Sequence, residues 1–222
     1  ELLRGGRAGA HYLLSLKEET LWEADQVAAV PVVIPSEAGD IDSLVRSVRA
    51  LQARGRPCIA DSILDPIHFG FTDAIVRYRE LRSLLPETEI MMGIGNLTEL
   101  TDADTAGMNA LLIGIASELG ITNILATEVS PHARSAVREA DFARRMMFAA
   151  RADSALPRDI GDKLMAVHER RPFPYAAAEI AEFAAAVKDP SFRIQVIAAG
   201  IHVYNRDGMR VGSDPFEFYP GL

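Results

Sequence analysis

The chain has 222 residues, of which 49% are hydrophobic and 24% are charged, with a formal net charge of -8. This composition is ordinary for a globular protein, and the negative charge argues against nonspecific nucleic-acid binding, which requires a basic face. The single cysteine, Cys58, excludes an internal disulfide framework. No apolar stretch approaches the roughly 18 residues of a membrane span, and no secretory signal is recognisable. We therefore expect a cytoplasmic protein that binds neither nucleic acid nor membranes.

Five short apolar runs predict buried parallel strands, because each has the length of a strand and helical spacing separates them. The runs are residues 11–16, 30–34, 58–61, 90–94 and 123–127. Three intervening segments carry apolar stripes typical of helices: Leu44, Val48 and Leu51; Ile75, Tyr78, Leu81 and Leu85; Met108, Leu112, Ile115 and Leu119. Strand-helix alternation of this kind predicts a parallel sheet, either open or closed into a barrel.

Capping residues predict where the helices begin. Thr72 is the expected cap of the second helix, and Asp102 or Asp104 that of the third. Ser130-Pro131 predicts the start of a long helix that reaches about Ala152.

The last third of the chain has a different pattern. Two helical pieces are expected near residues 159–168 and 176–187, followed by short antiparallel strands at 193–197, 201–204 and 209–211. Asn205-Arg206-Asp207-Gly208 has the composition of a tight hairpin turn. We expect one domain at 1–155 and a helical and antiparallel appendage at 156–222.

Polar residues follow the predicted strands, and the carboxyl ends of parallel strands form the working face of such sheets. The candidates are Asp61, Asp65 and His68 after the third strand, Asn96 and Glu99 after the fourth, and His132 and Arg134 after the fifth. A carboxylate and an amide at neighbouring strand ends suit a flat heterocycle with ring N–H and amino donors. Gly93 and Gly95 would let such a ring approach the backbone.

Each candidate also has a structural interpretation. Asp61 can cap a neighbouring backbone group, Asp65-Pro66 can form a simple turn, and His68 more often packs or caps than acts as a base. Asn96 after Gly95 can reflect left-handed turn geometry. His132 and Arg134 oppose the dipole of a helix start, which favours contact with an anion or a second substrate. The sequence contains no metal-binding spacing, P-loop or GxGxxG motif, so no metal is predicted.

Two stretches taken together, "IADSILDPIHFG" and "IMMGIGNLTELTDADTAGMNALLIGIASELGI", resemble the pterin-binding barrel family. That family comprises dihydropteroate synthases and, more distantly, methyltetrahydrofolate–corrinoid methyltransferases. Asp61 and Gly70 keep the family's spacing of a strand aspartate and a glycine nine residues later, with Ser62 where a proline is usual. Gly93-Ile94-Gly95-Asn96 resembles its later strand end, and Asn109 lies in the helix that follows.

The sequence is most similar to the dihydropteroate synthase-related proteins of tetrahydromethanopterin-linked one-carbon metabolism, through "LDPIHFGFT", "GIGNLTELTDADT" and "VSPHAR". The resemblance implies a TIM-type (β/α)8 barrel and a reduced pterin, of the tetrahydromethanopterin or folate type, as the ligand. It implies that Asp61 holds the amino and N–H edge of the pterin, that Asn96 reaches the other ring nitrogens, and that both belong to the catalytic site.

Counting strands against that barrel assigns the five runs to its last five βα units. Three strands are then expected from a preceding portion of the same gene product or from another chain, because a barrel cannot close without them. Open edge strands also favour a homo-oligomer.

Three functional hypotheses remain open. The first is a pterin-dependent transferase of one-carbon metabolism or cofactor biosynthesis. The second is a noncatalytic pterin-binding or scaffold protein, because the lysine and the Arg-x-His pair of dihydropteroate synthases are replaced around Asn96 and around Glu128–Arg134. The third is an unrelated barrel lyase or isomerase that acts on a small phosphorylated acid with Asp61 as base.

Overall fold

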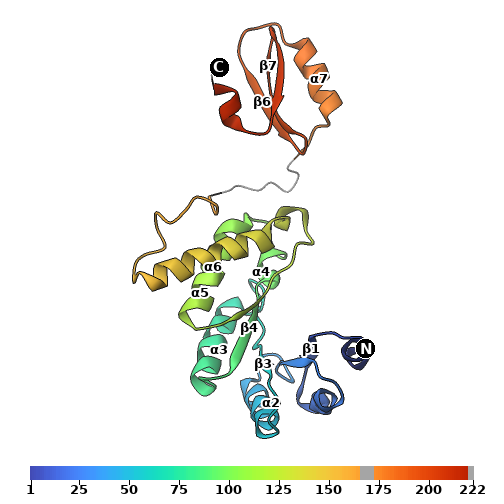
Figure 1. Cartoon of the computed structure of the whole chain (residues 1–222), viewed down its shortest axis with the longest axis vertical. Helices are drawn as coiled ribbons and strands as arrows, with labels where there is room; N and C mark the ends of the chain where they lie inside the picture. The colour runs from blue at the N-terminus through green and yellow to red at the C-terminus, as the bar shows by residue number, and fades with distance from the viewer. Residues whose placement is uncertain (166–172, 220–222) are drawn as a thin grey trace. The chain divides into compact units, whose positions relative to one another are not determined.

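The computed structural model describes residues 1–165 and 173–219. The chain divides into two compact units, residues 1–168 and 169–222, so the sequence-based boundary at 155 falls within the first unit (Figure 1). Each unit has its own sheet and its own core.

The first unit is mixed α/β, with strands and helices that alternate along the chain. Its strands are β1 (Tyr12–Leu16), β2 (Val30–Val33), β3 (Ile59–Ala60), β4 (Glu89–Gly93) and β5 (Asn123–Leu125). Its helices and 3-10 turns are α1 (Leu2–Arg7), η1 (Glu18–Gln26), α2 (Ile41–Ala53), α3 (Phe71–Leu84), α4 (Gly95–Thr98), α5 (Thr105–Glu118), η2 (Pro131–Ala133) and α6 (Ala136–Ala152). All five predicted strands and the three predicted helical stripes are confirmed within a few residues.

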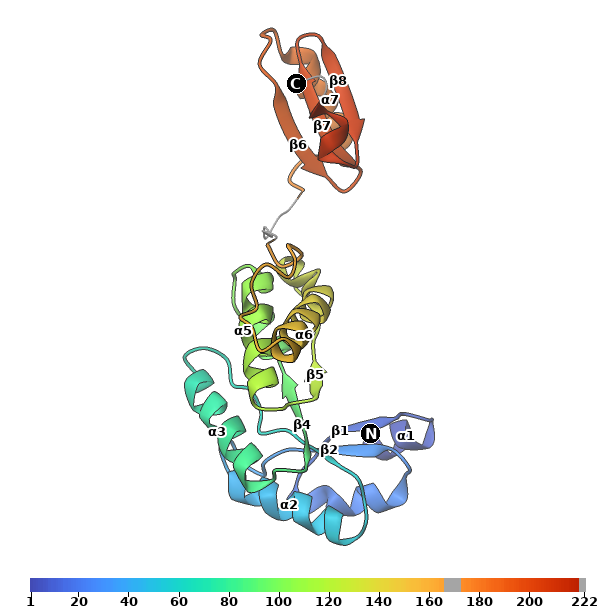
Figure 2. The same ribbon diagram turned by 60° about the vertical axis from the view of Figure 1, so that its left-hand side comes forward.

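The five strands form one parallel sheet in the order β1-β2-β3-β4-β5, which is their order along the chain. The strand order does not reverse, and the sheet curls instead of lying flat (Figure 2). Among the described strands β1 and β5 each pair on one side only, so the sheet is open at both edges.

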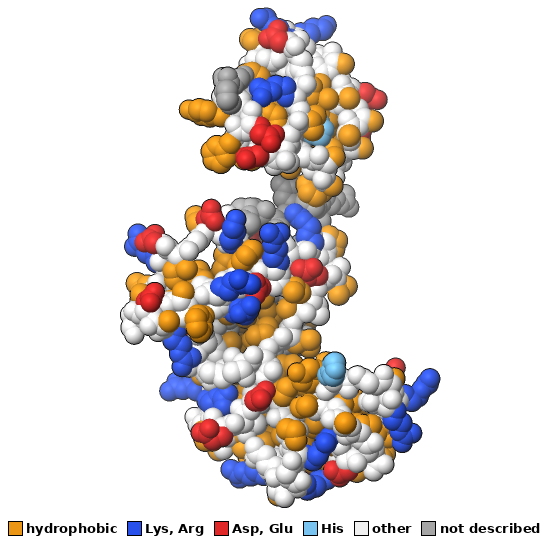
Figure 3. All heavy atoms as spheres, in the orientation of Figure 1, with side chains coloured by type: hydrophobic (Ala, Val, Ile, Leu, Met, Phe, Trp, Pro, Cys, Tyr) orange, Lys and Arg blue, Asp and Glu red, His pale blue; other side chains and the backbone are white. Residues whose placement is uncertain are grey.

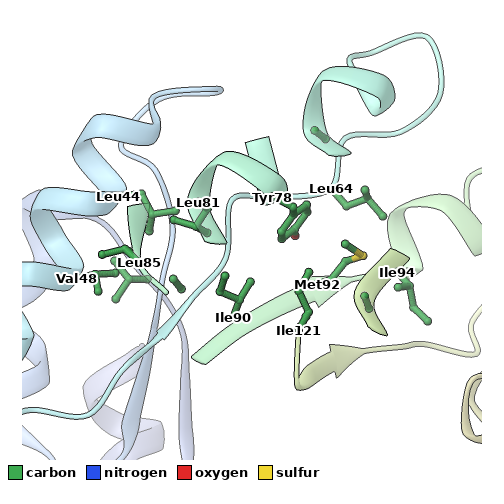
Figure 4. Packing of buried hydrophobic residues seen from close by; sticks show 14 of the residues in the cluster. Leu44, Val48, Leu64, Tyr78, Leu81, Leu85, Ile90, Met92, Ile94 and Ile121 are labelled. Atoms are coloured by element: carbon green, nitrogen blue, oxygen red, sulfur yellow. The ribbon is translucent and has the colours of Figure 1, made fainter. Parts of the chain in front are cut away.

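One face of the sheet is covered by the helices, because every second strand residue points to that face and apolar side chains recur at helical spacing in α2, α3 and α5. Leu13, Val33, Ala60, Ile90 and Met92 from the strands pack with the helices in one core. Figure 4 shows Leu44, Val48, Tyr78 and Leu81 of α2 and α3 in the same packed layer as the β4 side chains. This layer fixes the strand ends from which the candidate residues project.

The opposite face of the sheet is also apolar. Val32, Ile59 and Met91 form a separate buried cluster there. Strand register places Tyr12, Leu14 and Leu125 on the same face, where they are 55%, 49% and 40% exposed. We call this set the inner face: Tyr12, Leu14, Val32, Ile59, Met91 and Leu125.

Two predicted helix starts are wrong. The second helix is capped by Gly70 and not by Thr72, because Gly70 adopts a left-handed φ of 114° at which the chain turns into the helix. Ser130-Pro131 begins only the 3-10 turn η2, and α6 starts at Ala136 after Ser135 leaves helical geometry. The predicted end of this helix at Ala152 and the cap of α5 at Asp104 agree with the structure.

The second unit contains α7 (Ala177–Ala186), the antiparallel strands β6 (Arg193–Ile197), β7 (Gly200–Asn205) and β8 (Gly208–Gly212), and the turn η3 (Pro215–Glu217). Ile180, Ile197 and Tyr204 form its core. The small antiparallel sheet and the turn between Asn205 and Gly208 are confirmed, and Asn205 Oδ1 accepts the Asp207 N–H across that turn at 2.8 Å.

The helix predicted near residues 159–168 is not present over 159–165, which form turns and bends, and 166–168 lie outside the described residues. Asp159 has a left-handed φ of 59°, which ends any helical path there. In the described parts of the chain, no helix is both long enough and apolar enough to cross a membrane.

Candidate functional site

Asp61 lies at the carboxyl end of β3, where its backbone N–H still donates to Val33 O of the neighbouring strand at 2.9 Å. Its side chain is buried, with 8% of the residue exposed. Carboxylate oxygen Oδ1 accepts two hydrogen bonds, from the Tyr78 hydroxyl at 2.6 Å and from the Ile63 N–H at 2.8 Å. Asp61 is therefore held at a defined position just beyond the sheet.

Burial raises the pKa values of both Asp61 and Tyr78. Desolvation raises the pKa of Asp61, although the hydrogen bonds from Tyr78 and Ile63 lower it in part. Desolvation, together with the neighbouring Asp61 charge, raises the pKa of Tyr78 well above its ordinary value. Tyr78 consequently remains a hydrogen-bond donor to Asp61.

The loop from Asp61 to Gly70 has unusual backbone geometry. Ile63 and His68 have left-handed φ angles of 65° and 68°, and for a β-branched residue such as Ile63 this conformation is strained. Arg77 of α3 contacts this loop at two points, donating to Ile63 O at 3.2 Å and pairing with the Asp65 carboxylate. Asp65 thus acts as a loop anchor, and His68 is exposed at the loop's far end.

Asn96 lies on the neighbouring β4 end, in the short helix α4, with its side chain exposed. Its amide Nδ2 donates to Leu64 O at 2.8 Å, which ties α4 to the loop that follows Asp61. Because β3 pairs with β4, Asp61 and Asn96 lie at adjacent strand ends. They do so without direct contact: Asn96 binds the carbonyl of Leu64, three residues after Asp61.

A pocket of about 180 Å³ opens at the ends of β4 and β5. Its lining consists of Gly93, Gly95, Asn96, Glu99, Leu100, Leu125 and Thr127. Four of the sequence-predicted residues thus share one pocket, whereas Asp61 is not part of this lining. The pocket has the volume of a small ring, or of one end of a larger ligand.

The two glycines of β4 and α4 serve different purposes. A Cβ on Gly93 would meet no atom within 4 Å, so this position faces open space. A Cβ on Gly95 would come within 2.7 Å of Thr127 Oγ1. Gly95 is therefore required by the close approach of Thr127, and Gly93 alone leaves room for a ligand beside the backbone.

Glu99 joins the β4 end to the loop after β5. Its carboxylate accepts the Thr127 hydroxyl at 2.9 Å, the Val129 N–H at 2.8 Å and the Ser130 N–H at 2.7 Å. Partial burial raises the pKa of Glu99, but the hydrogen bonds from Val129, Ser130 and Thr127 outweigh it and lower the pKa to about 2. Glu99 is therefore ionised near neutral pH and accepts the backbone N–H groups of Val129 and Ser130 in this loop.

His132 and Arg134 lie away from the pocket lining. His132 is buried, and its Nε2 lies 3.0 Å from Thr98 O, so this nitrogen carries a proton and donates. His132 Nδ1 is 3.8 Å from Asp102 Oδ1. Arg134 is exposed and donates to Pro131 O at 3.4 Å. His132 therefore joins η2 to the segment that follows β4, and Arg134 contacts η2 itself.

Three residues that matter at this site escaped the sequence analysis: Arg77, Tyr78 as a polar group, and Thr127 as a partner of Glu99. Tyr78 lies in an apolar helical stripe, and its spacing reveals the buried face of α3 but not the target of its hydroxyl. Within the described residues, no group of three or more His, Cys, Asp or Glu side chains could hold a metal ion. The groups able to contact a cofactor are oxygens and amides: Asp61, Asn96, Glu99 and Thr127.

No known family model matches the chain. The chain is similar to an uncharacterized protein of Methanocaldococcus jannaschii, with 33% identity over 192 residues. The match covers 77% of this chain and 36% of that protein, so the chain spans little more than a third of its relative's length.

Proposed function

We propose that this chain is part of a pterin-binding protein of the dihydropteroate synthase-like type, and that its ligand is a reduced pterin of the tetrahydromethanopterin or folate class. The observation that carries the proposal is that a buried carboxylate, Asp61, and an amide, Asn96, lie at adjacent strand ends. Asn96 lines a pocket with open backbone at Gly93, and its amide contacts the loop that follows Asp61. A pterin offers adjacent N–H and amino donors on one edge and acceptors on others, which complements a carboxylate and an amide.

The proposal includes a TIM-type barrel as the parent fold. Sequential parallel strand order, a curled sheet, two open edges and an apolar inner face support this architecture. In a closed barrel the inner face is buried by the remaining strands, so those strands would come from another segment of the gene product or from a second chain. A homo-oligomer is one arrangement that would cover the open edges.

The protein is either a transferase of one-carbon metabolism or cofactor biosynthesis, or a noncatalytic pterin-binding protein. Glu99 favours the second alternative, because its low pKa and its three hydrogen bonds leave it unsuited to proton transfer near neutral pH. Asp61, with a raised pKa, is the group suited to acid-base work. A lyase or isomerase of a phosphorylated acid fits less well, because the Glu99 carboxylate occupies N–H donors that a phosphate would need.

Calorimetric titration with tetrahydrofolate tests the proposal. Loss of a charged hydrogen bond costs about 1.5–3 kcal/mol, so Asp61→Asn is expected to weaken binding about 10- to 100-fold. Asn96→Ala is expected to weaken binding as well, because it removes the amide and frees the Leu64 carbonyl.

Asp153→Asn is the matched control, since Asp153 is exposed at the end of α6 and outside the site. Binding by the unsubstituted protein that neither Asp61→Asn nor Asn96→Ala weakens would refute these two roles. Turnover of a pterin diphosphate or a methyl-pterin then separates the transferase from the noncatalytic protein.

A further inference from the structure

Consecutive residues of α3 reach back to the loop that presents Asp61. Tyr78 donates to Asp61 Oδ1, and Arg77 donates to Ile63 O and pairs with Asp65. Tyr78 is fully buried, in the same core layer as Leu64, Leu81 and Met92 (Figure 4). Because the ring is enclosed by packing, its hydroxyl has a fixed position from which to hold the carboxylate.

The two oxygens of Asp61 differ in what they contact. Oδ1 accepts both recorded hydrogen bonds, from Tyr78 and Ile63, which use its two lone pairs. No described residue donates to Oδ2, and Oδ2 is not among the fully enclosed polar atoms that lack a partner, so it keeps some access to solvent. A ligand donor therefore finds one oxygen of Asp61 already saturated and the other available.

Ile63, whose N–H donates to Oδ1, has a left-handed backbone with a φ of 65°. A conformation of this kind costs on the order of 1–3 kcal/mol and persists where surrounding contacts hold it. Arg77 supplies such contacts, on the carbonyl of Ile63 itself and on Asp65 two residues later. Gly70, which has a φ of 114°, packs closely against the same loop, since a Cβ there would lie 3.3 Å from Asp65 Oδ2.

We infer that Arg77 and Tyr78 are positioning residues, which fix the Asp61 carboxylate so that Oδ2 alone is presented to a neutral or cationic ligand with adjacent N–H and amino donors. This inference rests on the proposed function for the identity of the ligand. It deepens that function by naming the contact: both ligand donors bind Oδ2 of Asp61, instead of one donor binding each carboxylate oxygen. Such an oxygen accepts two hydrogen bonds from one donor edge and repels an anionic group.

The first test needs no ligand. The carboxyl carbon of Asp61 is followed by NMR during a pH titration of the unliganded protein, and the charged or titratable groups recorded around it are Tyr78 and, beside Tyr78, Arg77. Tyr78→Phe removes a hydrogen bond that favours the ionised carboxylate, so the Asp61 midpoint is expected to move to higher pH. Tyr204→Phe is the matched control, because that buried hydroxyl donates to Gln195 in the other unit. An unchanged Asp61 midpoint in Tyr78→Phe would overturn the inference.

The second test measures tetrahydrofolate affinity. Tyr78→Phe is expected to weaken binding roughly tenfold. Arg77→Lys is expected to weaken it too, because both contacts, to Ile63 O and to Asp65, come from the planar Nη2 group of Arg77, whose geometry a tetrahedral ammonium does not reproduce. If Tyr78→Phe fails to fold, Arg77→Lys decides alone. Weaker binding by Asp61→Asn with wild-type binding by both α3 variants would overturn the positioning role and leave the proposed function intact. If the unsubstituted protein does not bind tetrahydrofolate but Tyr78→Phe still shifts the Asp61 midpoint, the proposed ligand is refuted. The positioning of Asp61 by Tyr78 then still holds.

Discussion

At the scale of single residues, Gly93 and Gly95 differ in whether the structure has room for a side chain. Gly95→Ala is expected to destabilise the protein by about 1–3 kcal/mol, the usual cost of overpacking, because the new Cβ would meet Thr127 Oγ1 at 2.7 Å. Gly93→Ala is expected to change stability by less than about 0.5 kcal/mol, because that Cβ enters open space. Urea unfolding of the two variants measures the difference.

The steric origin of this effect has its own control. Gly95→Ala combined with Thr127→Ala removes the clash, so the double variant is expected to recover part of the lost stability. Recovery is incomplete because Thr127→Ala also removes the hydrogen bond from the Thr127 hydroxyl to Glu99. If Gly93→Ala and Gly95→Ala destabilise the protein equally, the contact with Thr127 is not the cause of the loss.

Glu99 predicts a dependence of stability on pH. Its pKa is lowered from the ordinary 4.5 to about 2, so its contribution is complete above 4.5 and is lost as the pH falls through about 2. Glu99→Gln is expected to cost about 1–3 kcal/mol at neutral pH, because two backbone N–H groups lose a charged acceptor. Its stability should then change less than that of the wild type between pH 4.5 and 2.

Urea unfolding across that pH window, with Glu80→Gln as control, measures the effect. Glu80 is exposed on α3, and its side chain makes no hydrogen bond or ion pair with the described residues. A Glu99→Gln profile parallel to that of the wild type would show that the lowered pKa does not stabilise the fold.

The sequence was enough to locate Asp61, Asn96 and Glu99 at the ends of neighbouring strands, because apolar runs show where strands stop. It could not reveal which of these residues already have partners. Asp61 and Tyr78 are separated by a loop and the first half of α3, and their hydrogen bond depends on the packing of that helix against β4. Partners of this kind follow from tertiary packing, which local patterns do not encode.

At the scale of elements, prediction succeeded where periodicity decides and failed where backbone geometry decides. The buried strands and the α2, α3 and α5 stripes follow directly from apolar spacing. The start of α3 depends instead on the left-handed φ of Gly70, and the start of α6 on the break at Ser135 after η2. These two helix starts therefore required the structure, whereas the cap of α5 at Asp104 was predicted from the sequence.

The inner-face residues exposed on the edge strand β1 predict that the chain associates with itself. Tyr12 and Leu14 are about half exposed on β1, which pairs on one side only among the strands that the structure describes, and such edges pair with other strands. Leu14→Lys is expected to reduce self-association of the chain, measured by sedimentation or light scattering, with little change in stability. Figure 3 shows other apolar side chains at the surface, so a matched control is needed.

Val76→Lys supplies that control, because Val76 is 59% exposed but lies on helix α3. Equal effects of the Leu14 and Val76 substitutions would indicate general hydrophobic association and not pairing at the sheet edge. No self-association by the unsubstituted chain would contradict the prediction outright.

At the scale of the whole molecule, the chain is two units with separate cores. The first is built on the parallel sheet, and the second on α7 and the sheet of β6, β7 and β8. The sequence predicted two parts, because the period of the apolar pattern and the turn residues change after the α6 helix, but it placed their boundary at 155, inside the first unit. Every candidate for ligand binding belongs to the first unit.

The separation predicts how a core substitution in the second unit acts. Ile180 is fully buried against Ile197 and Tyr204, so Ile180→Ala is expected to cost about 2–5 kcal/mol within that unit. The one tryptophan, Trp22, lies in the first unit and therefore reports on it alone. In urea, Ile180→Ala should leave the Trp22 fluorescence transition unchanged, while circular dichroism detects an additional loss of structure at lower urea. Leu44→Ala, at a fully buried position of α2, should move the Trp22 transition instead. If Ile180→Ala shifts the Trp22 transition as far as Leu44→Ala does, the two units unfold as one.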